Sequence, residues 1–219
     1  MKINTDGVLL GALIESDAPE SILDIGTGTG VIALMLAQRF ESANIDAVEI
    51  DKIAAITAEA NFKNSPFADR LACHPLSIEA YSNKYPVKKY DLIISNPPFY
   101  INSLHSPAKQ KQVAKHADQS FFETMLLLVS KHLSQQGTCW LVLPQRTSSI
   151  VKTIAASLSL NIRTVIYVRS FPDKEPHREI LELGVGEHQQ VERDFAIYAA
   201  EGVYTDLYKN TLKEFFTIF

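Results

Sequence analysis

Four consecutive residues, Asn96-Pro97-Pro98-Phe99, have the chemistry needed to hold a planar amine for reaction. An amine attached to a π system is a poor nucleophile because its lone pair is delocalised. Two acceptors aimed at its hydrogens, the Asn96 side-chain oxygen and the Pro97 backbone carbonyl, would free that lone pair. Because a residue that precedes proline is confined to extended geometry, both acceptors are preorganised.

Phe99 adds a ring face on which an extruded base can stack, as base-modifying enzymes require. We therefore predict Asn96, Pro97, Pro98 and Phe99 as catalytic residues of an N-methyltransferase. The alternative is that the two prolines only end a buried strand.

A glycine-rich segment, Asp24-Ile25-Gly26-Thr27-Gly28-Thr29-Gly30, lies between an expected strand and an expected helix. Gly26, Gly28 and Gly30 let the backbone turn sharply and approach a ligand closely. A phosphate-binding loop would gain nothing from Asp24, since like charges repel, whereas this carboxylate could face the ammonium or sulfonium of a cationic cofactor. A dinucleotide enzyme or a plain tight turn could show the same glycines.

Glu49 follows Gly30 by nineteen residues, at the end of the next expected strand. A carboxylate at that place can bind two ribose hydroxyls. An ordinary solvated strand end is the alternative for Glu49. Together with Asp24, this acid favours S-adenosylmethionine over NAD as the cofactor, and Ile50 and Asn96 are expected to contact it too.

Short β-branched runs alternate with longer helical stretches, which predicts βαβ units. The expected fold is α/β, a Rossmann-like doubly wound mixed sheet of about seven strands with helices on both faces. Strands are expected at 21–25, 45–49, 70–74, 90–95 and 139–143, with an antiparallel pair at 162–169 and 179–186 and an edge strand at 195–199. Helices are expected at 31–40, 52–63, 118–132, 148–158 and 205–216.

In such a sheet, ligands bind beyond the carboxyl ends of the strands, where the strand order reverses. Strands 21–25 and 90–95 are expected to be neighbours across that reversal, so the glycine segment and the Asn-Pro-Pro-Phe segment should face one crevice. We expect Gly137 to stop the helix before it and residues 100–115 to form a long connection. Long structureless connections are more often functional than accidental.

The composition predicts one soluble domain over residues 1–219, with 46% hydrophobic and 21% charged residues. The two cysteines form no metal-ligand spacing, so we expect no metal and a reducing cytoplasm. We see no signal peptide or membrane helix and expect a monomer.

A net charge of −4 argues against a general nucleic-acid coat protein. Lys109, Lys111, Lys115 and His116 nevertheless form a local basic segment, either a solvated loop or an RNA contact.

With these motifs placed, nearly the whole chain resembles the bacterial tRNA1(Val) adenine N6-methyltransferases. The shared segments are 1–11, the glycine loop, 96–99, 103–107, 114–116, 168–172, Tyr204-Thr205 and the tail 215–219. The resemblance implies methylation of N6 of an adenine in tRNA beside the anticodon. Members of that family usually carry a further stretch before this Met-Lys, which would help to cover the active site.

The resemblance also implies roles for single residues. Thr5 would pack against the methionine end of the cofactor, although Thr5 or Asp6 could simply cap the helix through Leu13. Ser77 would stand in for the acid that usually binds the cofactor adenine amine.

Three alternatives have the same motifs or part of them. Release-factor methyltransferases act on protein glutamine amides, but they typically carry a helical N-terminal domain that this sequence does not show. Guanine-N2 rRNA enzymes share Asn-Pro-Pro-Phe and are a closer rival. A nucleotide-binding module without catalysis is the third, which the intact motif at 96–99 argues against.

Overall fold

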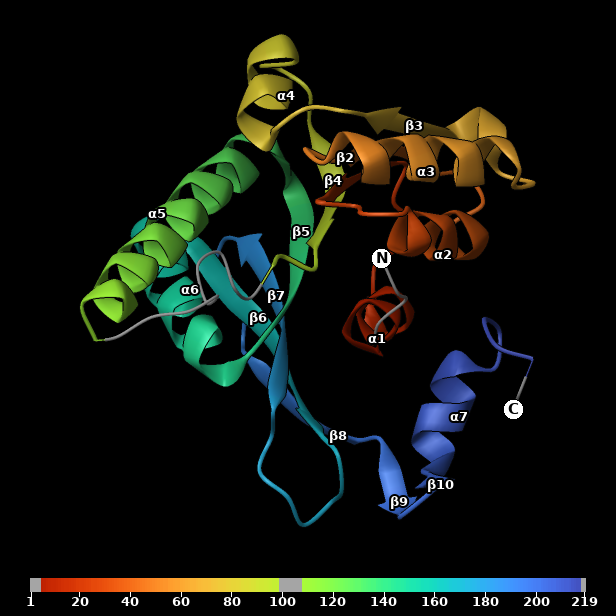
Figure 1. The fold of residues 1–219 in the computed structure, drawn as a ribbon, viewed down its shortest axis with the longest axis vertical. Coiled ribbons are helices and arrows are strands. Elements are labelled where there is room, and N and C mark those ends of the chain that lie inside the picture. The colour runs from red at the N-terminus through yellow and green to blue at the C-terminus, as the bar shows by residue number, and fades with distance from the viewer. Residues whose placement is uncertain (1–4, 99–107, 218–219) are drawn as a thin grey trace.

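A mixed β-sheet forms the centre of the molecule (Figure 1). The computed structural model describes residues 5–98 and 108–217, and for residues 108–118 it describes the backbone alone. Within these residues the sheet has eight strands in the order β3-β2-β1-β4-β5-β7-β6-β8, and a separate two-stranded ribbon pairs β9 with β10. The expected doubly wound α/β fold is confirmed, and the eighth strand is the expected edge strand, which the structure places at Val191–Ala196 rather than 195–199.

The strands are β1 (Ser21–Ile25), β2 (Asn44–Val48), β3 (Leu71–His74), β4 (Tyr90–Ser95), β5 (Leu133–Leu143), β6 (Leu160–Arg169), β7 (Arg178–Val185), β8 (Val191–Ala196), β9 (Tyr198–Ala200) and β10 (Val203–Tyr204). Strands β1 to β5 run parallel, and β7 lies antiparallel between β5 and β6. Strand β1 pairs with β4, with Ile25 opposite Ser95, so the predicted neighbours are confirmed.

The helices are α1 (Thr5–Leu13), α2 (Val31–Arg39), α3 (Lys52–Lys63), α4 (Ile78–Lys84), α5 (Ala108–His132), α6 (Gln145–Ser157) and α7 (Asp206–Leu212), with a 3₁₀ turn, η1 (Ala68–Arg70), before β3. Helices α4, α5 and α6 cover one face of the sheet, and α1, α2, α3 and α7 cover the other (Figure 1).

The hydrophobic core consists of two layers because successive residues of a strand point to opposite faces. In β4, Leu92 and Ile94 belong to the layer under α1 and α2, while Ile93 belongs to the layer under α5 and α6. All three are fully buried. Because both faces of this central strand are buried, its residues must be apolar in an uninterrupted run, as the sequence shows.

Helix α5 differs from the expected element. It begins at Ala108, whereas the sequence predicted a helix from residue 118 and a connection over 100–115. The spacing of apolar residues detects a helix only where one of its faces is buried. Residues 108–112 read Ala-Lys-Gln-Lys-Gln, which are strong helix formers but make no apolar face. Gly137 does not stop this helix, which ends at His132, but lies inside β5.

Helix α4 was not predicted. Its seven residues are too few to show apolar periodicity. The Ser77 hydroxyl accepts a hydrogen bond from the Ala80 amide at 3.2 Å and caps the first turn. In the part of the chain that the structure describes, no helix is long and apolar enough to cross a membrane.

Candidate active site

A cavity of about 530 Å³ opens beyond the carboxyl ends of β1, β2 and β4. The glycine segment forms its floor, and Asn96, Pro97 and Pro98 form part of its wall. The two motifs are 70 residues apart in the chain, and the parallel pairing of β1 with β4 brings them together. This is the crevice predicted from the strand order.

Glu49 lies at the end of β2 with 9% of its surface exposed. Its Oε2 accepts a hydrogen bond from the Gly28 amide and its Oε1 accepts one from the Asp51 amide, both at 2.8 Å. Each carboxylate oxygen keeps a second lone pair, so Glu49 can accept two further hydroxyl donors in the cavity. The same side chain thus fixes the glycine segment and offers the acceptors that a ribose diol requires.

The three glycines of the segment have positive φ angles of 73°, 60° and 86° at Gly26, Gly28 and Gly30. Gly26 and Gly28 line the cavity, as expected for residues that contact a cofactor. Gly30 is not among the lining residues and instead caps the start of α2. A Cβ at Gly30 would collide with the Phe62 ring, so the absence of a side chain there serves helix packing.

Asp24 lies beneath the glycine segment and is fully buried. Its Oδ2 accepts a hydrogen bond from the Thr27 hydroxyl at 2.6 Å. Burial raises the pKa of Asp24 to about 7, although the Thr27 hydrogen bond opposes part of the rise. Thr27 lines the cavity and Asp24 does not, so the Thr27 side chain links the carboxyl group to a residue of the cavity wall.

The described part of the Asn-Pro-Pro-Phe motif follows β4 directly. Ser95 anchors the strand end because its hydroxyl donates to the Ile25 carbonyl at 2.7 Å. Asn96 is half-buried, Pro97 is buried and Pro98 is exposed, and all three line the cavity. Phe99 lies outside the described residues.

The other expected cofactor residues are placed differently from one another. Ile50 lines the cavity with 71% of its surface exposed, which suits an apolar contact with a ligand. Ser77 lines it too, and caps α4 at the same time. Thr5 is exposed at the first position of α1 and does not line the cavity, to which this segment contributes Gly7.

The expected RNA-binding residues Lys109, Lys111, Lys115 and His116 all belong to α5. Their side chains lie outside the described residues. The helix places them on one continuous element, which replaces the loop expected for most of this segment.

Several lining residues were not singled out from the sequence. Leu76, Ile78 and Glu79 lie next to Ser77 in the chain, and Phe121 of α5 lines the cavity too. The sequence did indicate that Phe121 is buried, because it belongs to the apolar spacing that predicted a helix at 118–132. Nothing local distinguishes it from the core residues of that helix.

The strand that carries Glu49 is held by a buried polar network. Asp46 of β2 accepts a hydrogen bond from the Tyr90 hydroxyl at 2.9 Å and pairs with Lys88 at 2.5 Å and with His74 at 2.8 Å. Burial acts to raise the pKa of Asp46, but the bonds from His74, Lys88 and Tyr90 outweigh it and lower the pKa to about 2.

The cavity fits a nucleoside that carries a charged tail. Its volume lies within the range of small-molecule and cofactor sites. Ile50, Leu76 and Ile78 provide an apolar wall for a base, and Glu49 provides acceptors for a ribose. The turn from Gly26 to Gly28 keeps the backbone open where a tail would pass.

Comparison with known proteins agrees with this geometry. The methyltransferase small domain family matches residues 4–171. A curated tRNA1(Val) (adenine(37)-N6)-methyltransferase from Pedobacter heparinus is 46% identical over 219 residues, covering 100% of this chain and 92% of that protein. Its counterpart from Porphyromonas gingivalis strain W83 is 38% identical over 227 residues, covering 99% of this chain and 89% of the relative.

Solved structures share the fold. A predicted O-methyltransferase from Agrobacterium tumefaciens superposes with a TM-score of 0.71 at 15% identity, covering 95% of this chain and 96% of that one. A ribosomal protein L11 methylase from Lactobacillus delbrueckii gives 0.59 at 16% identity, covering 83% and 78%. The matched family model and the relatives' identity over the full chain show that this chain belongs to the methyltransferase small domain family, together with those curated relatives.

Proposed function

We propose that this protein transfers a methyl group from S-adenosylmethionine to N6 of an adenine in tRNA, next to the anticodon of tRNA1(Val). The observation that carries the proposal is the cavity in which Asn96 and Pro97 face the glycine segment and Glu49. The curated relatives named for this reaction match over the full chain, which supports the choice of adenine and of tRNA.

Binding of the cofactor is assigned to residues that line the cavity. Glu49 accepts hydrogen bonds from the ribose hydroxyls, and Ile50, Leu76 and Ile78 pack on the adenine ring. Gly26 and Gly28 leave room for the methionine end, with Thr27 and Asp24 behind them. Bound S-adenosylmethionine supplies an activated methyl group on a positively charged sulfur.

Asn96 and Pro97 act on the acceptor amine. The Asn96 side-chain oxygen and the Pro97 carbonyl would accept hydrogen bonds from its two N–H groups, which would turn the nitrogen lone pair towards the methyl group. The bound cofactor would supply the methyl group to this nitrogen, which would then release a proton to water. No metal and no strong general base are needed, and holding both reactants in line supplies much of the rate.

Pro98 and Phe121, which both line the cavity, are proposed to form with Phe99 the walls against which the flipped base packs. Ser77 is proposed to contact the cofactor adenine amine. Thr5 supports the methionine end through its place in the first turn of α1. The enzyme is proposed to act as a single domain and as a monomer, in the cytoplasm where tRNA is found.

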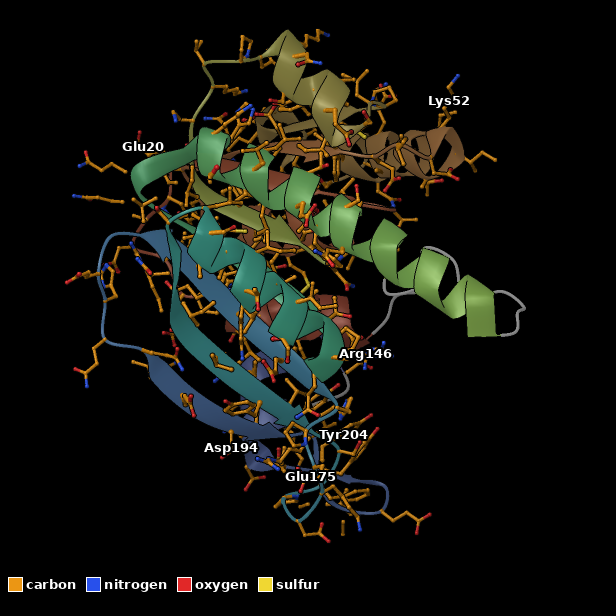
Figure 2. All side chains as sticks on the ribbon, turned by 90° about the vertical axis from the view of Figure 1, so that its left-hand side faces the viewer. Glu20, Lys52, Arg146, Glu175, Asp194 and Tyr204 are labelled. Atoms are coloured by element: carbon orange, nitrogen blue, oxygen red, sulfur yellow. The ribbon has the colours of Figure 1, made fainter. Side chains whose placement is uncertain are left out.

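RNA is proposed to bind across the carboxyl edge of the sheet. Lys109, Lys111, Lys115 and His116 on α5 are assigned to phosphates around the flipped base. Helix α6 packs against α5, and Arg146 is exposed at its N-terminal end (Figure 2). Among the side chains that the structure describes, no ion pair involves Arg146, so it is proposed to join this basic surface.

The test of the reaction uses unmodified tRNA1(Val) and labelled S-adenosylmethionine, followed by digestion to nucleosides. Labelled N6-methyladenosine is the expected product, and replacing the adenine beside the anticodon by guanine should abolish it. Labelled N2-methylguanosine, or label in added protein and none in tRNA, would refute the proposed substrate.

The test of the site uses Asn96→Ala. Turnover should be lost while cofactor affinity stays within about threefold, because the lost acceptor acts on the amine. Asn161→Ala is the matched control, since Asn161 bonds the Gly186 carbonyl at the opposite edge of the sheet. Near-normal turnover of Asn96→Ala would refute the two-acceptor mechanism.

The test of the RNA surface neutralises Lys109, Lys111 and Lys115 together, and Arg146 separately, to glutamine. Each lost phosphate contact should lower the salt slope of tRNA binding by about one. Lys89→Gln is the control, because Lys89 bonds the Lys131 carbonyl at the amino end of β4. Unchanged slopes in both variants would exclude this surface.

A further inference from the structure

The carboxyl group of Asp24 is buried without a positive partner. None of its surface is exposed, and Oδ1 accepts no hydrogen bond from the residues that the structure describes. Oδ2 is bonded to the neutral Thr27 hydroxyl. A carboxylate that is removed from water and has no counter-charge is costly, so such a group tends to keep its proton.

The elements packed around Asp24 compensate its burial only in part. In the sheet its neighbours are Ala47 on β2 and Ile94 on β4. The backbone amide of Ala33, in the first turn of α2, favours the ionised carboxylate, but burial outweighs it and the net pKa is raised. The titratable groups that face it are the Glu49 carboxyl group at the end of β2 and the Cys73 thiol on β3. The pKa of the Cys73 thiol is raised to about 11, so this group is neutral near pH 7, whereas the Glu49 carboxylate favours the neutral form of Asp24.

The cavity brings a ligand close to Asp24. Gly26 and Thr27, which line the cavity, are close in the chain to Asp24, and the Thr27 hydroxyl bonds its carboxyl group. The amino-acid end of S-adenosylmethionine carries an ammonium group. Opposite charge within a few ångströms favours the ionised carboxylate, and the effect is large where water is excluded.

We propose that Asp24 is a proton-linked counter-charge for the cofactor, protonated in the free protein and ionised when the ammonium end of S-adenosylmethionine binds beside Thr27. The released proton passes to the solvent. Asp24 is therefore a positioning residue that acts through Thr27 and does not touch the reacting atoms. The inference rests on the cofactor assigned above and is independent of which amine is methylated.

Proton release is measured by titration calorimetry of the whole protein with S-adenosylmethionine near pH 6.5, in two buffers of different ionisation enthalpy. A free pKa of about 7 leaves about three-quarters of Asp24 protonated at that pH, so about this fraction of a proton should be released. Affinity should rise with pH by up to about tenfold per unit below pH 7, because the ionised form binds the cation better.

Two cofactor analogues test, without any substitution in the protein, whether the ammonium group of the ligand causes the proton release. S-adenosylhomocysteine keeps the ammonium group and should release the same fraction of a proton. Methylthioadenosine has the same base and ribose without the amino-acid end, and should release none. Equal proton release by methylthioadenosine would overturn the proposal, because the ammonium group would then play no part.

Asp24→Asn tests the residue itself. Asparagine keeps an oxygen for the Thr27 hydroxyl, and its binding of S-adenosylmethionine should show no proton release and no pH dependence below pH 7. Asp69→Asn, the same change at an exposed carboxylate on η1, should release as many protons as the wild type. Full proton release by Asp24→Asn would overturn the proposal.

The readout needs no RNA. Wild-type protein that binds the cofactor with proton release but methylates no adenine would refute the proposed function and leave this inference intact. The reverse result, methylation of adenine without proton linkage, would refute this inference alone.

Discussion

Glu49→Gln is the most direct perturbation of the cofactor site. The Glu49 carboxylate accepts backbone hydrogen bonds from Gly28 and Asp51, and its remaining lone pairs face the cavity. Glutamine keeps the shape but replaces one oxygen by an amino group, which cannot accept from the backbone amide it meets or from a ribose hydroxyl.

The magnitude follows from those contacts. A hydrogen bond to a charged acceptor contributes about 1.5–3 kcal/mol, so loss of one such bond to the ribose weakens binding by about 10- to 150-fold. The NH₂ group of the new glutamine also meets the backbone N–H of either Gly28 or Asp51, to which it cannot bond. An unsatisfied buried donor costs about 1–3 kcal/mol of folding stability. The weaker cofactor binding and the lower stability both result from the loss of one carboxylate oxygen.

The assay is the dissociation constant of S-adenosylmethionine by calorimetry, with the unfolding temperature of the free protein measured alongside. Methylthioadenosine should lose affinity by the same factor, since it shares the ribose. Glu59→Gln is the matched control, because Glu59 is an exposed residue of α3 that pairs only with Lys63 among the described side chains. Binding by Glu49→Gln within twofold of the wild type would refute the ribose assignment.

Two further predictions concern the elements that support the site. Asp46→Asn should lower stability by about 2 kcal/mol at neutral pH, since the folded pKa of Asp46 is about 2 against an ordinary value of 3.8. A carboxyl group whose pKa is lowered by folding stabilises the folded state at pH values above its pKa in the unfolded chain. The loss of stability in Asp46→Asn should therefore shrink as pH falls from about 4 to 2. Urea unfolding at several pH values is the measurement, and a loss that stayed constant with pH would contradict the prediction. Gly30→Ala should destabilise the protein by about 1–3 kcal/mol, because its φ of 86° is left-handed and its Cβ would collide with Phe62. Gly202→Ala is the control for Gly30→Ala, since Gly202 shares a positive φ of 72° but has open space around its Cβ, and an equal loss in both variants would show that the collision is irrelevant.

Local patterns in the sequence were sufficient for several features. Three of these features each depend on a few adjacent residues. They are the glycines between a strand and a helix, the acid at the end of the next strand and the Asn-Pro-Pro turn after a buried strand. Because parallel strands share a carboxyl edge, their order placed Glu49 and Asn96 in one crevice, and the structure confirms that both line the same cavity. Alternation of strands and helices likewise predicted the class of fold.

Other features depend on contacts between distant elements. Gly30 packs under Phe62 of α3 rather than against the cavity, and Phe121 reaches the cavity across the fold from α5. The start of α5 carries helix-forming residues without an apolar face, so periodicity could not find it. These differences arise because a residue's type limits its chemistry, while its neighbours in space decide its role.

Asp24 illustrates that division most clearly. The sequence by itself determined that a carboxylate precedes the glycine segment, and its sign favoured a cationic cofactor. Only the tertiary structure decided that it lies beneath Thr27, fully buried and without a counter-charge. Burial changes the free energy of ionisation, and burial is a property of the packed strands and helices around a residue rather than of the residues beside it in the chain.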